Sequence, residues 1–281
     1  MFNFSLIGHP VSHSLSPVLH TEIFRQLGID AKYSAIDVQR EEIYQILQKM
    51  RLGEINGLNV TIPHKTEIMH FLDEINVKAK QIGAVNCVVN RNKLLLGYNT
   101  DWYGFSMLLK NNGINVHNKT VIILGAGGVA KSIIYTLLRE GVGMIVIVNR
   151  TIERATKLIR SFETVNRNSK LLVLPMEDIS SHLMADTIII NCTSVGMTPK
   201  TNKSPIEKNL INEHHTLIDT IYNPIESKFL KLGKECGAIT INGLDMFICQ
   251  GLASIELWFG EPISERVNFE QLKERLLDNL Q

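Results

Sequence analysis

The sequence contains few cysteines, and their spacing predicts neither a disulfide framework nor a metal centre. The cysteines are Cys87, Cys192, Cys236 and Cys249. They lie in apolar surroundings and lack the short spacing of zinc and redox motifs, so we expect reduced thiols in the core. Pro10 separates His9 from His13 and excludes a helical ligand pair, so no metal is predicted.

Long apolar runs, an excess of either charge, and internal repeats are also missing. No run approaches the roughly 18 residues that span a bilayer, and the opening stretch MFNFSLIG lacks the pattern of a signal peptide. The 29 lysines and arginines balance the 28 aspartates and glutamates, which argues against a nucleic acid or a membrane as partner. We expect a cytoplasmic protein, with a monomer and a homodimer both left open.

What is present is an ordinary globular composition with an alternating pattern. Apolar residues make up 44% of the 281 positions, enough for two packed domains. Short β-rich runs alternate with helical patterns through residues 4–62 and again through residues 119–223, which predicts an α/β fold with mainly parallel sheets. A hairpin around residues 90–93 is expected at a sheet edge. A helix near residues 101–113 separates the two series, and the helical C-terminal stretch could pack on either domain.

Two serines precede a proline in the run SHSLSP. Ser16 followed by Pro17 predicts a helix N-cap, and the apolar residues that follow recur at helical spacing. Ser14 lies outside that helix, where its hydroxyl and the free amides of the helix start could hold an anion. The alternative, which local pattern favours, is a solvated loop serine.

A glycine-rich turn joins a predicted strand to a predicted helix in TVIILGAGGVAKSIIYTLL. Residues 125–128 allow a tight turn and let backbone amides approach a pyrophosphate at the helix N-terminus. The next strand ends in Asn149 and Arg150, where an NAD-binding protein usually carries an acidic residue. Together with Arg154, this predicts recognition of a 2′-phosphate and therefore NADP(H). A solvated helix start is the alternative.

Lys65 and Asp101 are candidates for proton transfer. Pro63 predicts a helix with Lys65 in its first turn, where the positive end of the helix dipole would disfavour the charged lysine. Asp101 follows a predicted strand and opens a helix, so an N-cap explains it equally well. Both residues follow strand ends, where open α/β sheets bind ligands, and the carboxylate would orient the ammonium. An exposed lysine is the alternative for Lys65.

A series of motifs in register resembles the shikimate dehydrogenase family. The motifs are SHSLSP, NVTIPHK, IGAVNCV, GYNTDWYGF, GAGGVAKS, NRTIERA, NCTSVGM, DTIYNP and NGLDMFICQ. The resemblance implies an enzyme that reduces 3-dehydroshikimate to shikimate with NADPH, on the way to aromatic amino acids. It also implies that the C-terminal helices return to the first domain. The expected domains are a substrate-binding and catalytic one, residues 1–101 plus 242–281, and a Rossmann-type NADP-binding one, residues 102–241.

The same resemblance implies roles for individual residues. Ser14 and Ser16 would hold the substrate carboxylate, and Lys65 would be the acid/base group paired with Asp101. The other expected substrate contacts are Thr61, Asn86, Asp101, Tyr222 and Gln250. The expected NADP(H) contacts are Gly125, Ala126, Gly127, Gly128, Val129, Asn149, Arg150, Thr151, Arg154, Thr193, Thr220 and Gly243.

Some positions depart from the common family pattern, namely Val77, Cys87, Cys192 and Asp245. None of them removes an expected proton-transfer group. Asp245 adds a negative charge near the expected nicotinamide pocket, which would weaken cofactor binding.

Two alternative functions stay open. A relative that oxidises quinate with NAD is disfavoured by Arg150 and Arg154, which suit a 2′-phosphate. A non-catalytic NADP-binding regulator would have no need of Lys65 and Asp101, and both are present.

Overall fold

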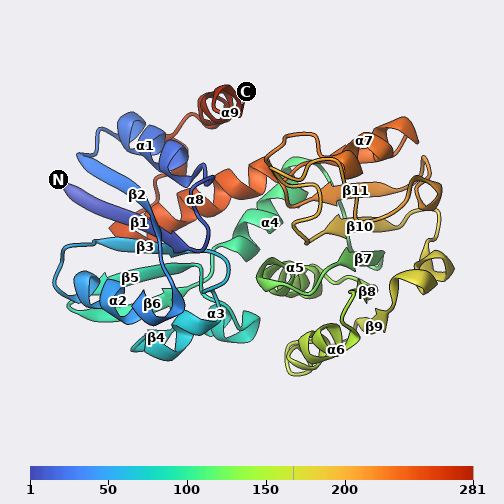
Figure 1. The fold of residues 1–281 in the computed structure, drawn as a ribbon, viewed down its shortest axis with the longest axis horizontal. Helices are drawn as coiled ribbons and strands as arrows, with labels where there is room; N and C mark the ends of the chain where they lie inside the picture. Colours follow the sequence, from blue (N-terminus) through green and yellow to red (C-terminus); the bar gives the residue numbers. More distant parts are fainter. Residues whose placement is uncertain (167, 281) are drawn as a thin grey trace. The chain divides into compact units, whose positions relative to one another are not determined.

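The structure, a computed structural model, describes residues 1–166 and 168–280 and contains two compact units. The first comprises Met1–Gly104 and the chain from Ile248 onward, and the second comprises Phe105–Phe247. Each unit has its own six-stranded sheet with helices packed on it (Figure 1). The predicted α/β fold class is therefore confirmed.

The sheet of the first unit is mixed and has the strand order β2-β1-β3-β5-β6-β4. β1 (Phe2–Gly8) is parallel to β2 (Ala31–Asp37) and to β3 (Gly57–Val60). β5 (Cys87–Arg91) is antiparallel to both β3 and β6 (Leu94–Tyr98). β3 and β6 therefore run in the same direction, and their carboxyl ends lie at the same edge of the sheet.

The predicted hairpin is confirmed as β5 and β6. Asn92 and Lys93 form its turn, and both have positive φ angles, of 52° and 70°. This conformation matches the right-handed twist of the paired strands. The hairpin is not at the sheet edge, as the sequence had suggested, because the short strand β4 (Glu74–Ile75) pairs with β6.

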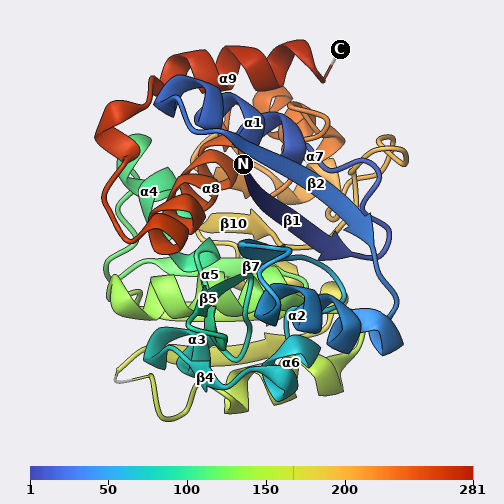
Figure 2. The same cartoon turned by 90° about the vertical axis from the view of Figure 1, so that its left-hand side faces the viewer.

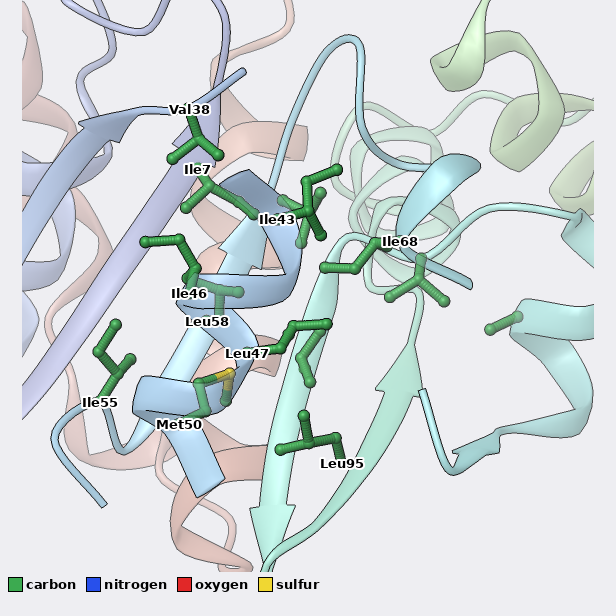
Figure 3. Packing of buried hydrophobic residues seen from close by; sticks show 14 residues of the cluster. Ile7, Val38, Ile43, Ile46, Leu47, Met50, Ile55, Leu58, Ile68 and Leu95 are labelled. Carbon is green, nitrogen blue, oxygen red and sulfur yellow. The ribbon is translucent and has the colours of Figure 1, made fainter. Parts of the chain in front are cut away.

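Helices cover both faces of this sheet because successive residues of β1 point to opposite sides. Ile7 faces α2 (Ile43–Arg51), whose apolar residues complete a buried cluster (Figure 3). Phe4 faces the other side, where α1 (Ser16–Leu27) and α8 (Leu244–Phe259) lie beside β1 (Figure 2). The Phe4 ring stacks on Trp258 of α8 with 4.5 Å between centroids. The remaining α-helices of this unit are α3 (Val77–Ile82), α4 (Asp101–Asn111, which continues into the second unit) and α9 (Phe269–Asp278).

The sheet of the second unit is entirely parallel, with the order β12-β11-β10-β7-β8-β9. Its strands are β7 (Thr120–Leu124), β8 (Met144–Val148), β9 (Lys170–Leu174), β10 (Ile188–Asn191), β11 (Thr216–Asp219) and β12 (Ile239–Ile241). Numbered from β7, this is the 3-2-1-4-5-6 order of a dinucleotide-binding Rossmann fold. The order reverses between β7 and β10, which is where such sheets bind ligands at the carboxyl ends of their strands.

The α-helices α5 (Gly128–Arg139), α6 (Ile152–Arg160) and α7 (Lys228–Glu235) belong wholly to the second unit, which also contains the 3-10 helices Met176–His182 and Lys208–Leu210. Almost every residue of β7, β8 and β10 is buried, as a parallel sheet covered on both faces requires. Among the described residues, no helix is long and apolar enough to cross a membrane. The cysteines are free, and all but the partly exposed Cys236 are buried.

Candidate active site

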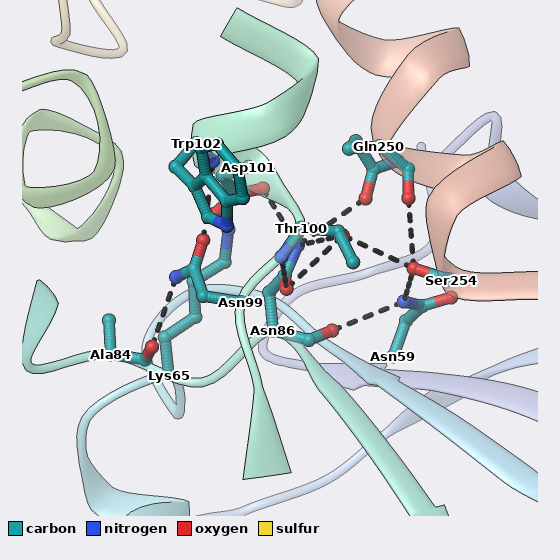
Figure 4. Close-up of polar contacts among 10 residues, drawn as sticks. All are labelled: Asn59, Lys65, Ala84, Asn86, Asn99, Thr100, Asp101, Trp102, Gln250 and Ser254. Atoms are coloured by element: carbon teal, nitrogen blue, oxygen red, sulfur yellow. Dashed lines mark hydrogen bonds and ion pairs between the residues drawn. The ribbon is translucent and has the colours of Figure 1, made fainter. Parts of the chain in front are cut away.

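Lys65 and Asp101 form an ion pair at the carboxyl edge of the first sheet (Figure 4). Lys65 Nζ donates to Asp101 Oδ2 at 2.6 Å, and the two side chains are only 14% and 7% exposed. Lys65 follows β3, and Asp101 follows β6. Because these strands end at the same edge, the chain brings the two predicted residues together. Partial exclusion of water strengthens their attraction beyond that of a surface pair.

The local structure around Lys65 differs from the prediction. No α-helix begins at Pro63; residues 62–66 form turns that lead into the 3-10 helix Glu67–Phe71. The His64 ring is buried and its Nε2 donates to the carbonyl of Val38 at 2.6 Å, while the carbonyl of Lys65 accepts the Val85 N–H at 2.8 Å. These contacts fix a turn. The helix-dipole argument for Lys65 is therefore wrong, and the carboxylate of Asp101 is its electrostatic partner.

Asp101 is not the N-cap that its position suggested. It is the first residue of α4, and its carboxylate is turned to other side chains. Asn99 Oδ1 accepts the Trp102 N–H instead, at 3.4 Å. The carboxylate is thereby left available to Lys65 on one oxygen and to Asn86 on the other.

Asn86 holds the second oxygen of the same carboxylate. Its Nδ2 donates to Asp101 Oδ1 at 2.8 Å and lies 3.4 Å from Gln250 Oε1. Its Oδ1 accepts the backbone N–H of Thr100 at 2.6 Å. A backbone N–H can only donate, so this contact determines which way the amide faces. Predicted residues from the turn after β3, the start of β5, α4 and α8 therefore meet at one place.

A buried network of polar side chains continues from Asn86 through Thr100 into the interior of the first unit. Thr100 Oγ1 lies 3.2 Å from Ser254 Oγ, and Ser254 Oγ accepts a hydrogen bond from Asn59 Nδ2 at 2.9 Å. The Tyr33 hydroxyl donates to Asn59 Oδ1 at 2.8 Å. Sequence reasoning missed these residues. An available signal was Asn59, a polar amide between the apolar residues Leu58 and Val60.

Ser14 and Ser16 lie together, but the position of Ser16 in the helix differs from the prediction. Ser14 Oγ donates to Ser16 Oγ at 3.1 Å and also lies 3.2 Å from the Ser16 N–H, which donates to it. The N-cap position of α1 is Leu15, and no side chain of the described residues caps the helix, so the assignment of Ser16 as the cap is wrong. A turn closed by the Ser14 N–H on the Val11 carbonyl brings the chain into the helix one residue earlier.

Thr61 lies at the start of the turn after β3, close to the end of β1. Its N–H donates to the Ile7 carbonyl at 2.9 Å, and its own carbonyl accepts the His64 N–H at 2.9 Å. Thr61 therefore lies between the end of β1, which leads to the serines, and the turn that carries Lys65.

In the second unit, the glycine-rich turn leads from β7 into α5. Gly125 has φ +104°, and a Cβ there would lie 2.7 Å from Thr193 Cγ2, so only glycine fits. Gly127 is the N-cap of α5, and among the described residues no side chain caps that helix. The backbone amides at this end are thus free of a capping side chain and lie at the switch point of the sheet.

The segment after β8 carries two cations, and β8 pairs with β7, the strand that leads into the glycine-rich turn. Asn149 Nδ2 donates to the Thr151 carbonyl at 2.7 Å, which shapes the chain before α6. Arg150 and Arg154 are both exposed. Within residues 1–166 and 168–280, neither guanidinium forms an ion pair with a carboxylate. The two cations are therefore available to an anion.

The remaining predicted residues of the second unit lie at the ends of β10, β11 and β12. Thr193 Oγ1 donates to Asn191 Oδ1 at 2.7 Å, and the Thr220 N–H donates to the Asn191 carbonyl at 3.1 Å. A Cβ on Gly243 would lie 2.4 Å from the Thr220 carbonyl oxygen, so glycine is required there too. Tyr222 stacks on Phe247 at 4.2 Å, and desolvation raises the pKa of its phenol to about 12.

Comparison with known proteins places this arrangement in a family. The family model described as shikimate dehydrogenase substrate binding domain matches residues 6–88, and that described as shikimate / quinate 5-dehydrogenase matches residues 107–242. A shikimate dehydrogenase (NADP(+)) of Carboxydothermus hydrogenoformans is 41% identical over 256 residues, covering 91% of this chain and 90% of its own length. The chain belongs to the shikimate dehydrogenase family.

Solved shikimate dehydrogenases have the same fold. One, crystallised with NADP⁺, is 36% identical, with a TM-score of 0.90 and coverage of 100% of this chain and 96% of its own. That of Thermus thermophilus, in complex with NADP(H) and shikimate, is 31% identical, with a TM-score of 0.86 and complete coverage of both chains (100%). The resemblance stated from the motifs is confirmed.

Most departures from the common shikimate dehydrogenase pattern have a structural explanation. Cys87 is buried, which raises the pKa of its thiol to about 12 despite contacts with Ser254 and Trp258. Burial also raises the pKa of the Cys192 thiol. Asp245 lies in the first turn of α8, where the helix dipole favours negative charge, and accepts a hydrogen bond from Asn111 Nδ2 at 3.4 Å. Nothing in the structure explains the exposed Val77.

Proposed function

We propose that this chain catalyses the reversible, NADPH-dependent reduction of 3-dehydroshikimate to shikimate, as a cytoplasmic enzyme of aromatic amino acid biosynthesis. Family membership supports the reaction. The observation that carries the proposal for this chain is the Lys65–Asp101 pair, 2.6 Å between Nζ and Oδ2, with Asn86 on the other carboxylate oxygen. A protein that only sensed the cofactor would not need an oriented, partly desolvated proton donor.

Lys65 is the proposed proton donor in the reducing direction. As negative charge develops on the ketone oxygen, Nζ transfers a proton to it, and in the oxidising direction Lys65 takes the proton back. Asp101 Oδ2 accepts the Nζ hydrogen bond and orients Nζ, so the proton is held at a defined atom. The protein residues therefore supply position and charge stabilisation to the reacting oxygen.

The substrate contacts are proposed from the residues around this pair. Asn86 and Gln250 present an amide group each beside Asp101 and suit ring hydroxyls, and Thr61 is a further hydroxyl ligand. Ser14 and Ser16, whose Oγ atoms are 3.1 Å apart at the start of α1, suit the carboxylate. Tyr222, a residue of the second unit, stays a prediction from the resemblance.

The second unit fits NADP(H). Bound NADPH supplies the hydride. The turn of residues 125–129 would face the pyrophosphate with backbone amides. In the part of the chain that the structure describes, no side chain caps α5, and no atom beyond the chain neighbours of Gly127 lies within 4 Å of a Cβ built on it. Asn149, Thr151, Arg150 and Arg154 would hold the 2′-phosphate, with the guanidinium groups as its counter-charges. Thr193, Thr220 and Gly243 are proposed to contact the nicotinamide half.

A spectrophotometric assay that crosses two substrates with two cofactors tests the proposal. Purified protein should oxidise NADPH with 3-dehydroshikimate, and oxidation of NADH should be slower by at least about tenfold, because only NADPH carries the 2′-phosphate. Lys65→Ala protein, prepared in the same way, controls for contaminating host enzyme. Failure of the native chain to consume NADPH with 3-dehydroshikimate would favour the non-catalytic regulator.

Dual use of quinate is the other alternative, and the same assay separates it. Run in the oxidising direction with NADP⁺ or NAD⁺, shikimate should be preferred to quinate. Faster oxidation of quinate with NAD⁺ would replace the proposed substrate and cofactor while leaving Lys65 and Asp101 in their roles.

A further inference from the structure

Asp219 is a buried carboxylate at the carboxyl end of β11 for which the proposed reaction gives no role. Its exposure is 0%. Oδ1 accepts hydrogen bonds from Asn191 Nδ2 and from the Ile221 N–H, each at 3.0 Å. Oδ2 accepts the Ser227 hydroxyl at 2.5 Å. One side chain thus joins β10, the segment that follows β11, and the N-terminus of α7.

The contact with Asn191 extends to the glycine-rich turn. While Asn191 Nδ2 donates to Asp219, Asn191 Oδ1 accepts the Thr193 N–H at 3.0 Å and the Thr193 hydroxyl at 2.7 Å. The Thr193 methyl in turn occupies the space that a Cβ on Gly125 would need. The Thr193 N–H fixes which way the Asn191 amide faces, and Asp219 and the Val195 carbonyl accept from its Nδ2. Asp219 therefore helps to hold the amide that holds the loop beside Gly125.

The contact with Ile221 fixes the backbone of the segment that follows β11, at the same edge of the sheet. Ile221 directly follows Thr220, and the Thr220 carbonyl packs against Gly243. Ser227 caps α7 by accepting the Leu230 N–H at 3.4 Å while it donates to Asp219. The carboxylate of Asp219 therefore bonds to three places, the end of β10, the segment after β11 and the start of α7, and the segment after β12 packs against the second of them.

The surroundings of Asp219 disfavour its ionised form and provide no cationic partner among the described residues. Burial raises the pKa of Asp219 to about 6, against the lowering effect of its three hydrogen bonds. Cys192 after β10 and Tyr222 after β11 are titratable groups of the neighbouring segments; both are neutral near pH 7, and burial raises their pKa values further. Glu226 and Lys228, on either side of Ser227, are exposed. Within the described residues Asp219 forms no ion pair.

The position of Asp219 in the sheet indicates which half of a dinucleotide it serves. Rossmann sheets bind the two nucleotide halves on opposite sides of the switch point, here between β7 and β10. Arg150 and Arg154 follow β8 and mark that side as the adenosine side. Asp219 and the segments it holds follow β10, β11 and β12, on the nicotinamide side.

We infer that Asp219 is a positioning residue for the nicotinamide half of NADP(H), acting through Asn191 and through the backbone of Ile221, and that the adenosine half does not depend on it. This inference rests on the proposed NADP(H) function. It predicts that loss of the charge weakens binding of the whole dinucleotide while leaving binding of its adenosine part unchanged.

Calorimetric titration of Asp219→Asn with two ligands tests the inference. Asparagine keeps the size of the side chain and removes the charge, which weakens the hydrogen bonds from Asn191 and Ile221. At pH 7.5 the Kd for NADP⁺ should rise about tenfold, and the Kd for adenosine 2′,5′-bisphosphate should stay within about twofold. Asp178→Asn, which removes an exposed carboxylate of the same unit, should change neither Kd.

The pH dependence provides a readout that a general packing defect would not move. Above about pH 6 Asp219 is ionised and holds its partners; as the pH falls through its pKa, the carboxylate takes up a proton and the hydrogen bonds weaken. NADP⁺ should therefore bind less tightly to the native chain at pH 5 than at pH 7.5, beyond the loss shown by Asp219→Asn. The phosphate of the ligand titrates in the same range, but it does so equally for both proteins.

Three results would overturn the inference: an unchanged Kd for NADP⁺ in Asp219→Asn, an equal rise for both ligands, or parallel pH profiles of the native chain and the variant. If Asp219→Asn fails to fold, Ser227→Ala removes one donor and leaves the carboxylate, and a rise of about threefold for NADP⁺ alone is expected. An equal rise in the Kd for both ligands in Ser227→Ala would also overturn the inference. Absence of turnover with 3-dehydroshikimate would overturn the proposed function but leave this binding test valid.

Discussion

At the carboxyl ends of their sheets, the first unit uses side chains and the second uses mainly the backbone. In the first unit, side chains contact side chains: Lys65, Asp101 and Asn86 form a partly desolvated cluster with defined donors and acceptors. In the second, the turn after β7 is shaped by glycine and by backbone amides. Proton transfer needs a charged group held at one atom, whereas a pyrophosphate can be met by amides that any sequence carries.

This contrast predicts different consequences of mutation. Loss of a side chain in the first unit should remove chemistry without removing the fold. In the turn of the second unit, the sensitive change is the addition of a side chain. The predictions that follow test this contrast, beginning with the largest expected effect.

Lys65→Ala should lower kcat by about 100-fold or more, because it removes the proton donor, while KM for 3-dehydroshikimate changes little. Steady-state kinetics with saturating NADPH would measure both constants. Lys80→Ala, which removes an exposed lysine of the same unit, is the matched control and should retain native kinetics. A kcat close to native in Lys65→Ala would remove Lys65 from the mechanism.

Arg150→Gln combined with Arg154→Gln should reduce the preference for NADPH over NADH by about 30-fold, since both counter-charges of the 2′-phosphate are lost. The ratio of kcat/KM for the two cofactors measures this preference. Arg160→Gln, an exposed arginine in the last turn of the same helix, should leave the ratio unchanged. Retention of the native preference by the double variant would contradict the assignment.

Gly125→Ala should lower the free energy of unfolding by about 2 kcal/mol, because alanine at φ +104° is strained and its Cβ meets Thr193. Gly127→Ala should cost less than about 1 kcal/mol, since Gly127 has ordinary φ and open space for a Cβ. Urea unfolding of the two variants gives the comparison. Equal losses would show that the turn does not depend on the close approach at Gly125.

Ser14→Ala should raise KM for 3-dehydroshikimate by about fivefold and leave Tm within about 1 °C of the native value. The hydroxyl has two weak structural contacts, both with Ser16: it donates to Ser16 Oγ at 3.1 Å and accepts the Ser16 N–H at 3.2 Å. Its loss should therefore affect mainly a bound carboxylate. Ser12→Ala, an exposed serine of the same loop, is the control. An unchanged KM in Ser14→Ala would make Ser14 a loop residue without a binding role.

Sequence reasoning predicted much of this molecule because several signals were local and strong. Alternating β-rich and helical runs predicted the strands of both sheets except the short β4 and β12, and the run GAGG between a strand and a helix predicted the turn at residues 125–128. The hairpin at Asn92 and Lys93 was predicted in its place along the chain, but not in its place in the sheet, because pairing with β4 depends on residues that are distant in sequence.

The errors in the site came from rules that apply to isolated helix starts. Ser16 before Pro17 and Lys65 after Pro63 both have the pattern of a helix N-terminus. A turn closed by the Ser14 N–H on the Val11 carbonyl moves the N-cap of α1 to Leu15. The hydrogen bond of the buried His64 ring fixes a turn, not an α-helix, at Lys65. In each case a contact formed by tertiary folding overrides a local preference. The network of Asn59, Thr100 and Ser254 was missed for a related reason, since hydrogen bonding between β3, the segment before α4, and α8 leaves no trace in local periodicity.

By itself, the sequence determined the alternating α/β pattern, the family, the balance of charge and the residue types that the proposed reaction needs. These follow from composition and short-range order, which each stretch of chain carries on its own. The tertiary structure decided which groups meet: Asp101 with Lys65 rather than with its own helix, and Asp219 with Asn191, Ile221 and Ser227. A hydrogen bond has a range of about 3 Å, so partners distant in sequence are selected only when packing brings their strands and helices into register.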